Sequence, residues 1–413
     1  MYRMILKSRI KQGRLVLKFK DGSIERYGSE GPEVTWVLQS PATMKRIFRN
    51  WELRFGEAYI DGEWEVEGGS LLDLMSLLRR NFTLPNLPWV ARLSALALYV
   101  QQGRNSIGLS RSNVARHYDL DTHLFQLFLD KEMNYSCGYF ETPDTSLEAA
   151  QRAKCELIAK KLALLSGQRV LDIGCGWGSL AMYLAERYRV HVTGLTLSEE
   201  QHSVAVAEVK SRGLDKLVDI RIEDYRKHQG SYDRVVSVGM FEHVGRKSFY
   251  DYFKAVDDFL NDDGVALIHS IGRTGFPRRA NSWMRTYIFP GGYLPALSEI
   301  TRAVEKTNLN TADIEVLRRH YELTLAAWRS KFMAARDEFV KCKGERFTRI
   351  WEFYLTIAEV AFRCTDICVF QMQFLKQDDT LPITRNYMYG RAVDDTTSER
   401  ERDANLSLHR PAN

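Results

Sequence analysis

From residue 169 onward the sequence repeats one pattern, in which a short apolar run is followed by a longer stretch with helical spacing. The apolar runs lie at residues 169–173, 190–194, 218–222, 234–238 and 265–269. Strands that are buried on both faces give such runs. An intervening helix returns the chain to the end of the sheet at which the previous strand began, so that the next strand runs parallel to it. The alternation predicts an α/β fold with a doubly wound, mostly parallel sheet. Residues 313–317 and 368–375 are expected to extend it to seven strands with an antiparallel edge.

The region before this pattern has a different organisation. Short alternating segments at 15–19 and 24–27 precede a stretch punctuated by Gly and Asp at 55–64, and helical spacing begins near Leu71. We expect a small α+β domain over residues 1–110, a catalytic domain over 111–392 and a polar, disordered tail over 393–413. Residues 80–112 have the composition of a linker. The apolar stretch at 89–100 within them is a candidate contact with lipid, and a helix packed between domains is the alternative that we favour.

Composition narrows the class of partner. The chain has 413 residues, 45% of them apolar, and a net charge of +5, so it can bury a full core. The weak positive charge gives little support for a nucleic-acid partner and fits a mild attraction to an anionic membrane surface. No apolar stretch is long enough to cross a bilayer and the N-terminus lacks the core of a signal peptide, so we expect a cytoplasmic protein with peripheral membrane contact.

The six cysteines form no C-x-x-C pair, and the sequence contains no H-E-x-x-H motif. Neither a zinc site nor a disulfide framework is therefore predicted, and we expect no metal.

A glycine-rich turn, D-I-G-C-G-W-G, follows the first apolar run of the α/β pattern. Its members are Asp172, Gly174, Gly176 and Gly178. Glycines let the backbone turn tightly and approach a ligand, and the following helix offers free N–H groups. A dinucleotide site needs its third glycine at the position of Ser179, which argues against an NAD-dependent oxidoreductase. Asp172 suits a ligand with an ammonium group, as in S-adenosylmethionine (SAM); a purely structural turn is the alternative.

The end of the second run lacks the carboxylate that often holds a cofactor ribose. The sequence there is G-L-T-L-S-E-E-Q, so Thr196 and Gln201 are the candidates for the ribose hydroxyls. Ser198 with Gln201 is also a capping-box pattern, and both interpretations can hold together.

Several further motifs occur in a fixed order around the turn. They include M-N-Y-S-C-G-Y-F at 133–140, G-M-F-E-H-V-G at 239–245, I-H-S-I-G at 268–272, Y-I-F-P-G-G-Y-L-P at 287–295 and H-Y-x-x-T-L-x-x-W at 320–328. With the G-L-T-L-S-E-E-Q segment, they make the chain resemble the cyclopropane-fatty-acyl-phospholipid synthase family from about residue 55 to 390. The resemblance implies a class I SAM-dependent methyltransferase fold.

The resemblance also implies a reaction. SAM delivers a methyl cation to a cis double bond of an unsaturated phospholipid acyl chain, and a bound bicarbonate takes a proton from the new methyl group as the ring closes. The residues that match the bicarbonate site of the family are Cys137, Glu242, His269, Ile271 through its backbone, and Tyr321. Those that match the cofactor contacts are Tyr135, Ser136, the turn, Thr196, Gln201, Asp224 and Tyr225. A homodimer at the inner membrane face is a further expectation.

The residue types are consistent with this chemistry but also have simpler explanations. A carbocation needs a dry pocket with aromatic faces, and the motifs concentrate aromatic residues: Tyr135, Tyr139, Phe140, Phe241, Tyr287, Phe289 and Tyr293. Any one of them can be ordinary core. Cys137 can be a small buried hydrophobe, Glu242 a solvated charge, His269 a core histidine and Tyr321 a packing residue.

The chain also departs from the family pattern. Ala358 occupies the position where many members carry a cysteine, which excludes a covalent cysteine there. The adjacent Glu359 is either a pocket carboxylate or a helix charge, and we favour the helix charge. The E-D and N-G pairs that commonly precede the H-Y motif are replaced by Ala312-Asp313 and Val316-Leu317. Nothing in the sequence separates ring closure from a methylene- or methyl-branched product. A lipid-binding protein that retains SAM affinity without chemistry is a remaining alternative.

Overall fold

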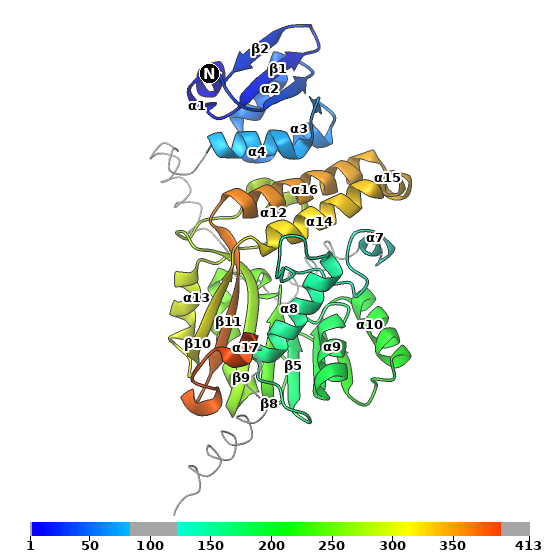
Figure 1. The fold of residues 1–413 in the computed structure, drawn as a ribbon, viewed down its shortest axis with the longest axis vertical. Helices are drawn as coiled ribbons and strands as arrows, with labels where there is room; N and C mark the ends of the chain where they lie inside the picture. Colours follow the sequence, from blue (N-terminus) through cyan, green and yellow to red (C-terminus); the bar gives the residue numbers. More distant parts are fainter. Residues whose placement is uncertain (1, 83–121, 390–413) are drawn as a thin grey trace, which may run out of the picture.

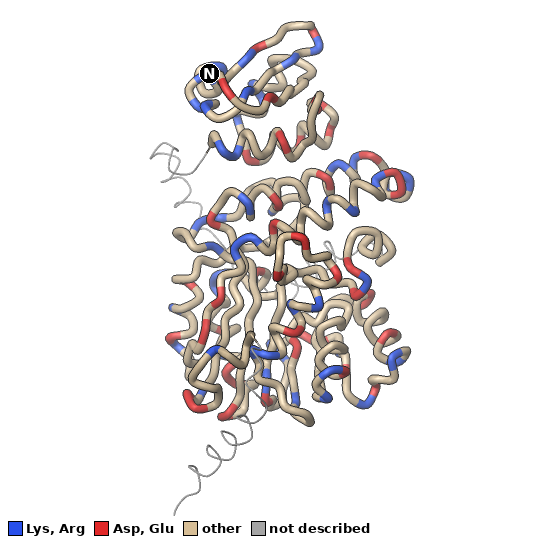
Figure 2. The backbone as a smooth tube through the Cα atoms, viewed as in Figure 1, with Lys and Arg blue, Asp and Glu red and all other residues tan. Residues whose placement is uncertain are grey.

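The computed structural model describes residues 2–82 and 122–389. A small N-terminal α+β region lies at one end, a layer of long helices lies in the middle, and a large sheet flanked by helices forms the rest (Figure 1). The apolar stretch 89–100, the predicted boundary near residue 110 and the predicted tail lie outside the described residues. Basic and acidic residues are interspersed along both parts of the chain (Figure 2).

The N-terminal region is built on a four-stranded sheet of order β2-β1-β3-β4. Its strands are β1 (Arg14–Phe19), β2 (Ile24–Tyr27), β3 (Glu33–Leu38) and β4 (Trp64–Glu67); its helices are α1 (Tyr2–Arg9), α2 (Pro41–Arg49), α3 (Trp51–Ile60) and α4 (Leu71–Asn81). The predicted α+β region is confirmed, as are β1, β2 and the helix at Leu71. The sequence interpretation missed β3, although its burial alternates, and β4, which has a single buried side chain, Trp64.

This region packs on α16 (Glu345–Cys364) through α3 and α4. The Phe55 and Tyr59 rings lie 5.8 and 5.7 Å from the Phe353 ring of α16. Gly56 faces the same junction, where an added Cβ would lie 2.5 Å from Trp283 and 2.7 Å from Phe353. The absence of a side chain at Gly56 therefore permits the close approach of the N-terminal region to the rest of the chain.

The large sheet has seven strands in the order β10-β11-β9-β8-β5-β6-β7. They are β5 (Arg169–Ile173), β6 (His191–Thr196), β7 (Val218–Ile222), β8 (Tyr232–Val238), β9 (Leu260–Arg273), β10 (Asn310–Leu317) and β11 (Ile367–Leu375). Strands β5 to β9 pair in parallel, whereas β11 is antiparallel to both β9 and β10. The predicted α/β fold, the seven strands and the antiparallel edge are confirmed.

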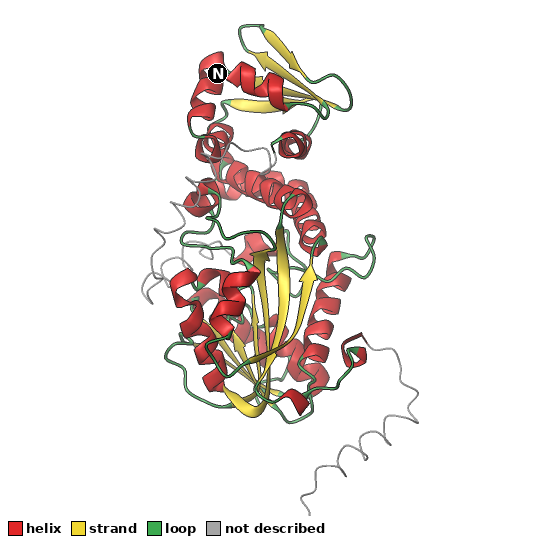
Figure 3. Cartoon of the chain, turned by 90° about the vertical axis from the view of Figure 1, so that its left-hand side faces the viewer, coloured by secondary structure: helices red, strands yellow, loops and turns green. Residues whose placement is uncertain are grey.

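Helices cover both faces of this sheet (Figure 3). On β9 and β11, Ile268, Phe370 and Met372 belong to the core shared with α11 (Phe249–Phe259) and α13 (Leu297–Val304). Because successive side chains alternate, Leu267 and His269 face the opposite side. There Leu267 packs in the same cluster as Ile158 of α8 (Leu147–Lys161).

The remaining helices are α7 (Thr122–Gln126), α9 (Ser179–Tyr188), α10 (Glu199–Ser211), α12 (Ser282–Tyr287), α14 (His320–Ala334), α15 (Arg336–Lys343) and α17 (Asn386–Tyr389). Of these, α12, α14 and α15 lie with α16 in the middle layer (Figure 1). Within the described ranges, no helix has the length and apolarity needed to span a bilayer.

Candidate active site

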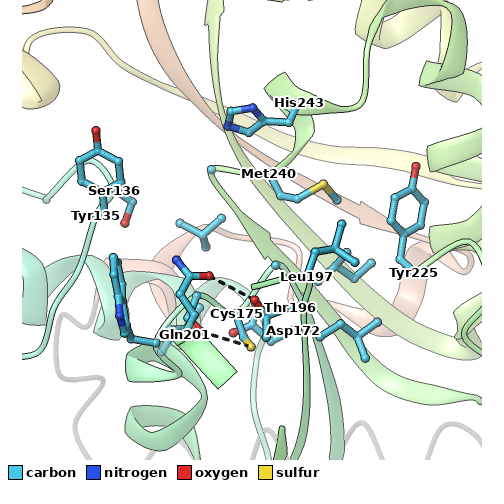
Figure 4. Close-up of a pocket in the computed structure, with 18 of the residues that line it drawn as sticks. Tyr135, Ser136, Asp172, Cys175, Thr196, Leu197, Gln201, Tyr225, Met240 and His243 are labelled. Atoms are coloured by element: carbon cyan, nitrogen blue, oxygen red, sulfur yellow. Dashed lines mark hydrogen bonds between the residues drawn. The ribbon is translucent and has the colours of Figure 1, made fainter. Parts of the chain in front are cut away.

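A cavity opens at the carboxyl ends of β5, β6 and β8 (Figure 4). Ligands bind at this end of the strands in open α/β sheets. Among the residues predicted to contact the cofactor, the cavity is lined by Tyr135, Ser136, Asp172, Gly174, Gly176, Thr196, Gln201, Asp224 and Tyr225. The remaining member, Gly178, is the N-cap residue of α9 with φ of +80° and does not line it. The structure thus brings together residues that lie up to 90 positions apart.

The glycine turn adopts positive φ angles, a backbone conformation that residues with side chains rarely adopt. Gly176 has φ of +57° with open space around it, so its conformation, and not crowding, favours glycine. At Gly174, with φ of +87°, an added Cβ would also lie 2.9 Å from the Met240 side chain. The turn therefore keeps bare backbone along one wall of the cavity.

Asp172 is the most informative polar group in the cavity. It is 1% exposed, and its Oδ2 has no hydrogen-bond partner among the described residues. Burial raises its pKa to about 7, against an opposing effect of the Lys154 charge. A buried carboxyl oxygen without a partner is costly, and a ligand ammonium would compensate it. The buried carboxyl of Asp172 therefore fits the ammonium group at the methionine end of SAM.

Thr196 and Gln201 are held against each other across the cavity wall. The Thr196 hydroxyl donates a 3.1 Å hydrogen bond to Gln201 Oε1 (Figure 4). The Ser198 hydroxyl accepts from the Gln201 backbone N–H at 3.2 Å and caps α10. The capping role and the placement against the cavity therefore coexist.

Asp224 reaches the cavity in a fixed ion pair. Arg226 donates from Nε and Nη2 to the two carboxylate oxygens of Asp224 at 2.8 and 2.6 Å. The neighbouring Tyr225 ring packs edge-on against Tyr252, with centroids 5.5 Å apart. Both Tyr225 and Arg226 line the cavity.

Lys154 lines the cavity and was missed by the sequence interpretation. Its side chain is buried, and Nζ donates to Asn134 Oδ1 at 2.8 Å and to Ser136 Oγ at 3.0 Å. Lys154 lies on the buried stripe of α8 with Leu147, Ala150 and Ile158. A lysine at a position with apolar helical spacing was the available signal, because burying an ammonium is costly unless it has partners.

Glu242 is held by hydrogen bonds from a side chain and from the backbone of β9. It lies in a single 3₁₀ turn, Phe241–His243, and is 7% exposed. The Ser270 hydroxyl donates to Glu242 Oε2 at 2.9 Å, and the Ile271 backbone N–H lies 3.5 Å from Oε1. Burial raises the pKa of Glu242 to about 7, so this carboxyl can hold or release a proton near neutrality.

His269 and Ile271 lie on the same face of β9, two residues apart. His269 is 2% exposed, and its Nδ1 lies 3.2 Å from Gln371 Nε2. Burial, with smaller effects of the Lys154 and Lys161 charges, lowers the pKa of His269 to about 3. The imidazole is therefore neutral at physiological pH.

The segments that carry Cys137 and Tyr321 are joined by a hydrogen bond between Gly138 and Thr324. Cys137 is fully buried, and burial raises the pKa of its thiol, so it is not a thiolate. The Gly138 N–H donates to Thr324 Oγ1 at 3.0 Å, one turn beyond Tyr321 on α14. The Tyr321 ring packs 4.6 Å from Phe362.

None of these five residues lines the cofactor cavity. Two of them, Cys137 and Glu242, directly adjoin the cavity-lining residues Ser136 and His243 in the chain. The 7% exposure of Glu242 contradicts a solvated position for this residue, and burial also lowers the pKa of the half-buried His243 to about 4. Cys137 and Glu242 therefore lie next to the cavity in the sequence, whereas His269 and Ile271 come from β9 and Tyr321 from α14.

The aromatic residues of the motifs divide between the cavity and the core. Tyr135 and Phe289 line the cavity, and Tyr135 Oη lies 2.9 Å from Tyr354 Oη. Phe241 and Tyr293 instead belong to the core beneath α11 and α13.

Glu359 is not a solvated helix charge, and that interpretation was wrong. Its side chain is fully buried where α14 packs on α16, and it accepts from Arg329 at 2.7 Å and from Arg363 at 2.5 Å. Two guanidinium groups compensate the buried carboxylate. Among the described residues, no group of three or more His, Cys, Asp or Glu could hold a metal ion.

Comparison with known proteins identifies the family. The model of the mycolic acid cyclopropane synthetase family matches residues 107–372. The chain belongs to this family. The resemblance read from the motifs is confirmed, and the protein is a SAM-dependent methyltransferase. A second model, a domain of unknown function, matches residues 1–83.

Relatives of this family span most of the chain. The cyclopropane-fatty-acyl-phospholipid synthase of Escherichia coli K12 is 39% identical over 82% of this chain and 86% of its own. A probable fatty acid methyltransferase of Pseudomonas putida is 33% identical over 91% and 96%. The tuberculostearic acid methyltransferase UfaA1 of Mycobacterium tuberculosis is 34% identical over 88% of both chains.

Solved structures match the catalytic part. The cyclopropane synthase MmaA2 of Mycobacterium tuberculosis is 32% identical, with a TM-score of 0.61 over 64% of this chain and 97% of its own. The mycolic acid cyclopropane synthase CmaA1 in complex with SAH and CTAB gives the same values.

Proposed function

We propose that the protein transfers a methylene unit from SAM to the cis double bond of an unsaturated acyl chain in a membrane phospholipid, forming a cyclopropane ring. The observation that carries this proposal is the position of Glu242. Its buried carboxyl, with a pKa near 7, lies beside the Ile271 N–H and adjoins a residue of the SAM-type cavity. The Glu242 carboxyl would thus accept or release a proton close to the methyl group of bound SAM.

The cofactor would be held by this chain's own polar groups. Asp172 would receive the ammonium group, and Thr196 with Gln201 would face the ribose. The bound SAM supplies an electrophilic methyl group to the alkene. Tyr135 and Phe289 present aromatic side chains to the cavity, which excludes water and stabilises positive charge.

The second group of residues would hold bicarbonate. Glu242, His269, the Ile271 N–H, Cys137 and Tyr321 are proposed to surround it. Bound bicarbonate supplies the base that accepts the proton lost from the new methyl group. Because His269 is neutral and the Cys137 thiol is protonated, both can act as hydrogen-bond donors to an anion.

The N-terminal region supports a phospholipid as the substrate. The Escherichia coli relative, whose name specifies a fatty acyl phospholipid, matches over 82% of this chain. A cyclopropane mycolic acid synthase of Mycobacterium leprae matches over only 63%. We therefore propose that the small α+β domain of residues 1–110 serves lipid docking, that the catalytic domain spans 111–392, and that the enzyme is cytoplasmic and peripheral to the inner membrane face. A homodimer remains part of this proposal.

A branched product is the second candidate. The Pseudomonas putida relative is named a probable fatty acid methyltransferase and the Mycobacterium tuberculosis relative a tuberculostearic acid methyltransferase, and neither name mentions a cyclopropane ring. The same methyl transfer, followed by a 1,2-hydride shift that moves the cation to the methylated carbon and by loss of a proton from the methyl group, would give a methylene-branched chain. Reduction of that chain by a separate hydride donor would give a methyl branch.

One experiment separates these outcomes. Purified protein is incubated with SAM and vesicles of a cis-monounsaturated phospholipid, with and without bicarbonate, and the released acyl chains are analysed by mass spectrometry. A gain of one CH₂ with a ring supports cyclopropanation, and the same gain with a retained double bond supports branching. No gain under either condition would exclude both.

A further inference from the structure

Strand β11 carries two polar residues on a face that is otherwise covered. Gln371 and Gln373 are 0% and 1% exposed, and they project toward α8. The last residue of α8, Lys161, has a fully buried side chain. Buried amides and an ammonium on one face require mutual hydrogen bonds.

Lys161 determines the orientation of the Gln371 amide. Its Nζ pairs with Glu315 of β10 and donates to Gln371 Oε1 at 2.8 Å. An ammonium carries three donors and no acceptor, so the carbonyl oxygen of the amide must face it. The reversed amide would place an NH₂ group against an NH₃⁺ group.

The amide orientation in turn determines the protonation of His269. With Oε1 on Lys161, Gln371 presents its NH₂ group to His269 Nδ1 at 3.2 Å. That contact is a hydrogen bond only when Nδ1 accepts. Since the ring is neutral, its single proton lies on Nε2.

We propose that Lys161 and Gln371 are positioning residues that hold His269 in the Nε2–H tautomer, so that the ring offers the reactive site a donor and not a lone pair. The proposal rests on the proposed function only in assigning His269 to that site. An Nε2–H donor of His269 complements an anionic base, as the backbone N–H of Ile271 on the same strand does. A ring lone pair in the same position would repel that anion.

The chain of contacts is assembled from four segments. Glu315 on β10, Gln371 on β11, His269 on β9 and Lys161 on α8 lie up to 210 residues apart in sequence. The register of β11 places Gln371 directly opposite both His269 and Glu315.

The test uses the full-length protein with ¹⁵N-labelled histidine, with the His269 signals assigned from a His269→Gln variant. Nitrogen chemical shifts distinguish protonated from unprotonated ring nitrogens. We expect an unprotonated Nδ1 and a protonated Nε2 in the unaltered protein. In Gln371→Glu the carboxylate accepts from both neighbours, so the proton should move to Nδ1. Turnover should fall roughly ten- to hundredfold, the range for groups that orient an imidazole, with the SAM dissociation constant unchanged.

The control is Gln377→Glu, which makes the same chemical change at an exposed residue just beyond the end of β11. It should leave the His269 nitrogen shifts unchanged. A protonated Nδ1 in the unaltered protein, or an unmoved proton in Gln371→Glu, would overturn the proposal. A reversed tautomer with full turnover would overturn the role of His269 in the reaction, whereas a protein without acyl-chain product but with the expected tautomer would refute the proposed function instead.

Discussion

The Ser270 hydroxyl donates a 2.9 Å hydrogen bond to Glu242 Oε2 and so orients a buried carboxyl whose other oxygen faces the Ile271 N–H. Ser270 lies on β9 and Glu242 follows β8, so the parallel pairing of these strands creates the contact. Because the bond crosses between two strand ends, the carboxyl has a defined direction before any ligand binds.

Replacing Glu242 by Gln keeps the shape of the side chain and removes its titratable proton. We expect turnover to fall by about 100-fold or more, as for loss of a general acid or base, because the amide cannot exchange the proton that the carboxyl holds beside Ile271. The SAM dissociation constant, measured by titration calorimetry, should change little because Glu242 does not line the cavity. Ser270→Ala removes only the supporting bond and should cost less. Loss of SAM affinity in Glu242→Gln would instead place this residue in the cofactor site.

Replacing Asp172 by Asn should have opposite effects on stability and on cofactor binding. Burial raises the pKa of Asp172 from 3.8 to about 7, so its ionisation destabilises the ligand-free fold. This cost is absent below about pH 4 and complete above about pH 7, where it reaches roughly 4 kcal/mol at most. Asp172→Asn should therefore raise the melting temperature of the ligand-free protein at pH 8 but not at pH 4.

The same Asp172→Asn variant should bind SAM more weakly, because the ammonium group loses its charged partner. Calorimetric titration at pH 8 measures the affinity, and Asp144→Asn, on an exposed loop, is the matched control. A destabilised Asp172→Asn protein at pH 8 would show that the carboxylate already has a partner in the ligand-free state.

Replacing Lys154 by Met should weaken SAM binding by about tenfold. The change removes the donor to Asn134 and Ser136, and it removes the positive charge that opposes the raised pKa of Asp172. Lys160→Met on the same helix is the control, since Lys160 is partly exposed and has only a surface pair with Glu156. Equal SAM affinities for the two variants would contradict a role for Lys154 in the cavity.

Replacing Gly56 by Ala should destabilise the junction between the N-terminal region and α16. A methyl group 2.5 Å from Trp283 and 2.7 Å from Phe353 forces these rings to move, which typically costs 1–3 kcal/mol. The melting temperature should fall, whereas Gly69→Ala, whose nearest neighbour would lie at 3.4 Å, should leave it nearly unchanged. An unaltered melting temperature in Gly56→Ala would mean that the N-terminal region can move away from Trp283 and Phe353 without a loss of stability.

Local patterns predicted the elements that depend on local physics. The inner parallel strands were predicted because burial on both faces gives continuous apolar runs, and the glycine turn was recognisable because its backbone needs a positive φ. The edge strands β7 and β10 are buried on one face only and follow a weaker pattern. Strand β3 was missed although Val34, Trp36 and Leu38 alternate in burial, since such short segments are ambiguous in isolation. The interpretation of Glu359 failed because its partners Arg329 and Arg363 come from another helix and another turn.

The sequence by itself determined the α/β alternation, the cofactor turn and, through the order of its motifs, the family. Only the tertiary structure decided which polar groups share a site. Lys161, Gln371 and His269 each resemble an ordinary charged, polar or core residue in the sequence, and they meet because β11 inserts antiparallel between β9 and β10 beneath α8. Hydrogen bonds between residues 102 and 210 positions apart leave no periodic signal, because their cost and benefit arise only when the surrounding side chains exclude water.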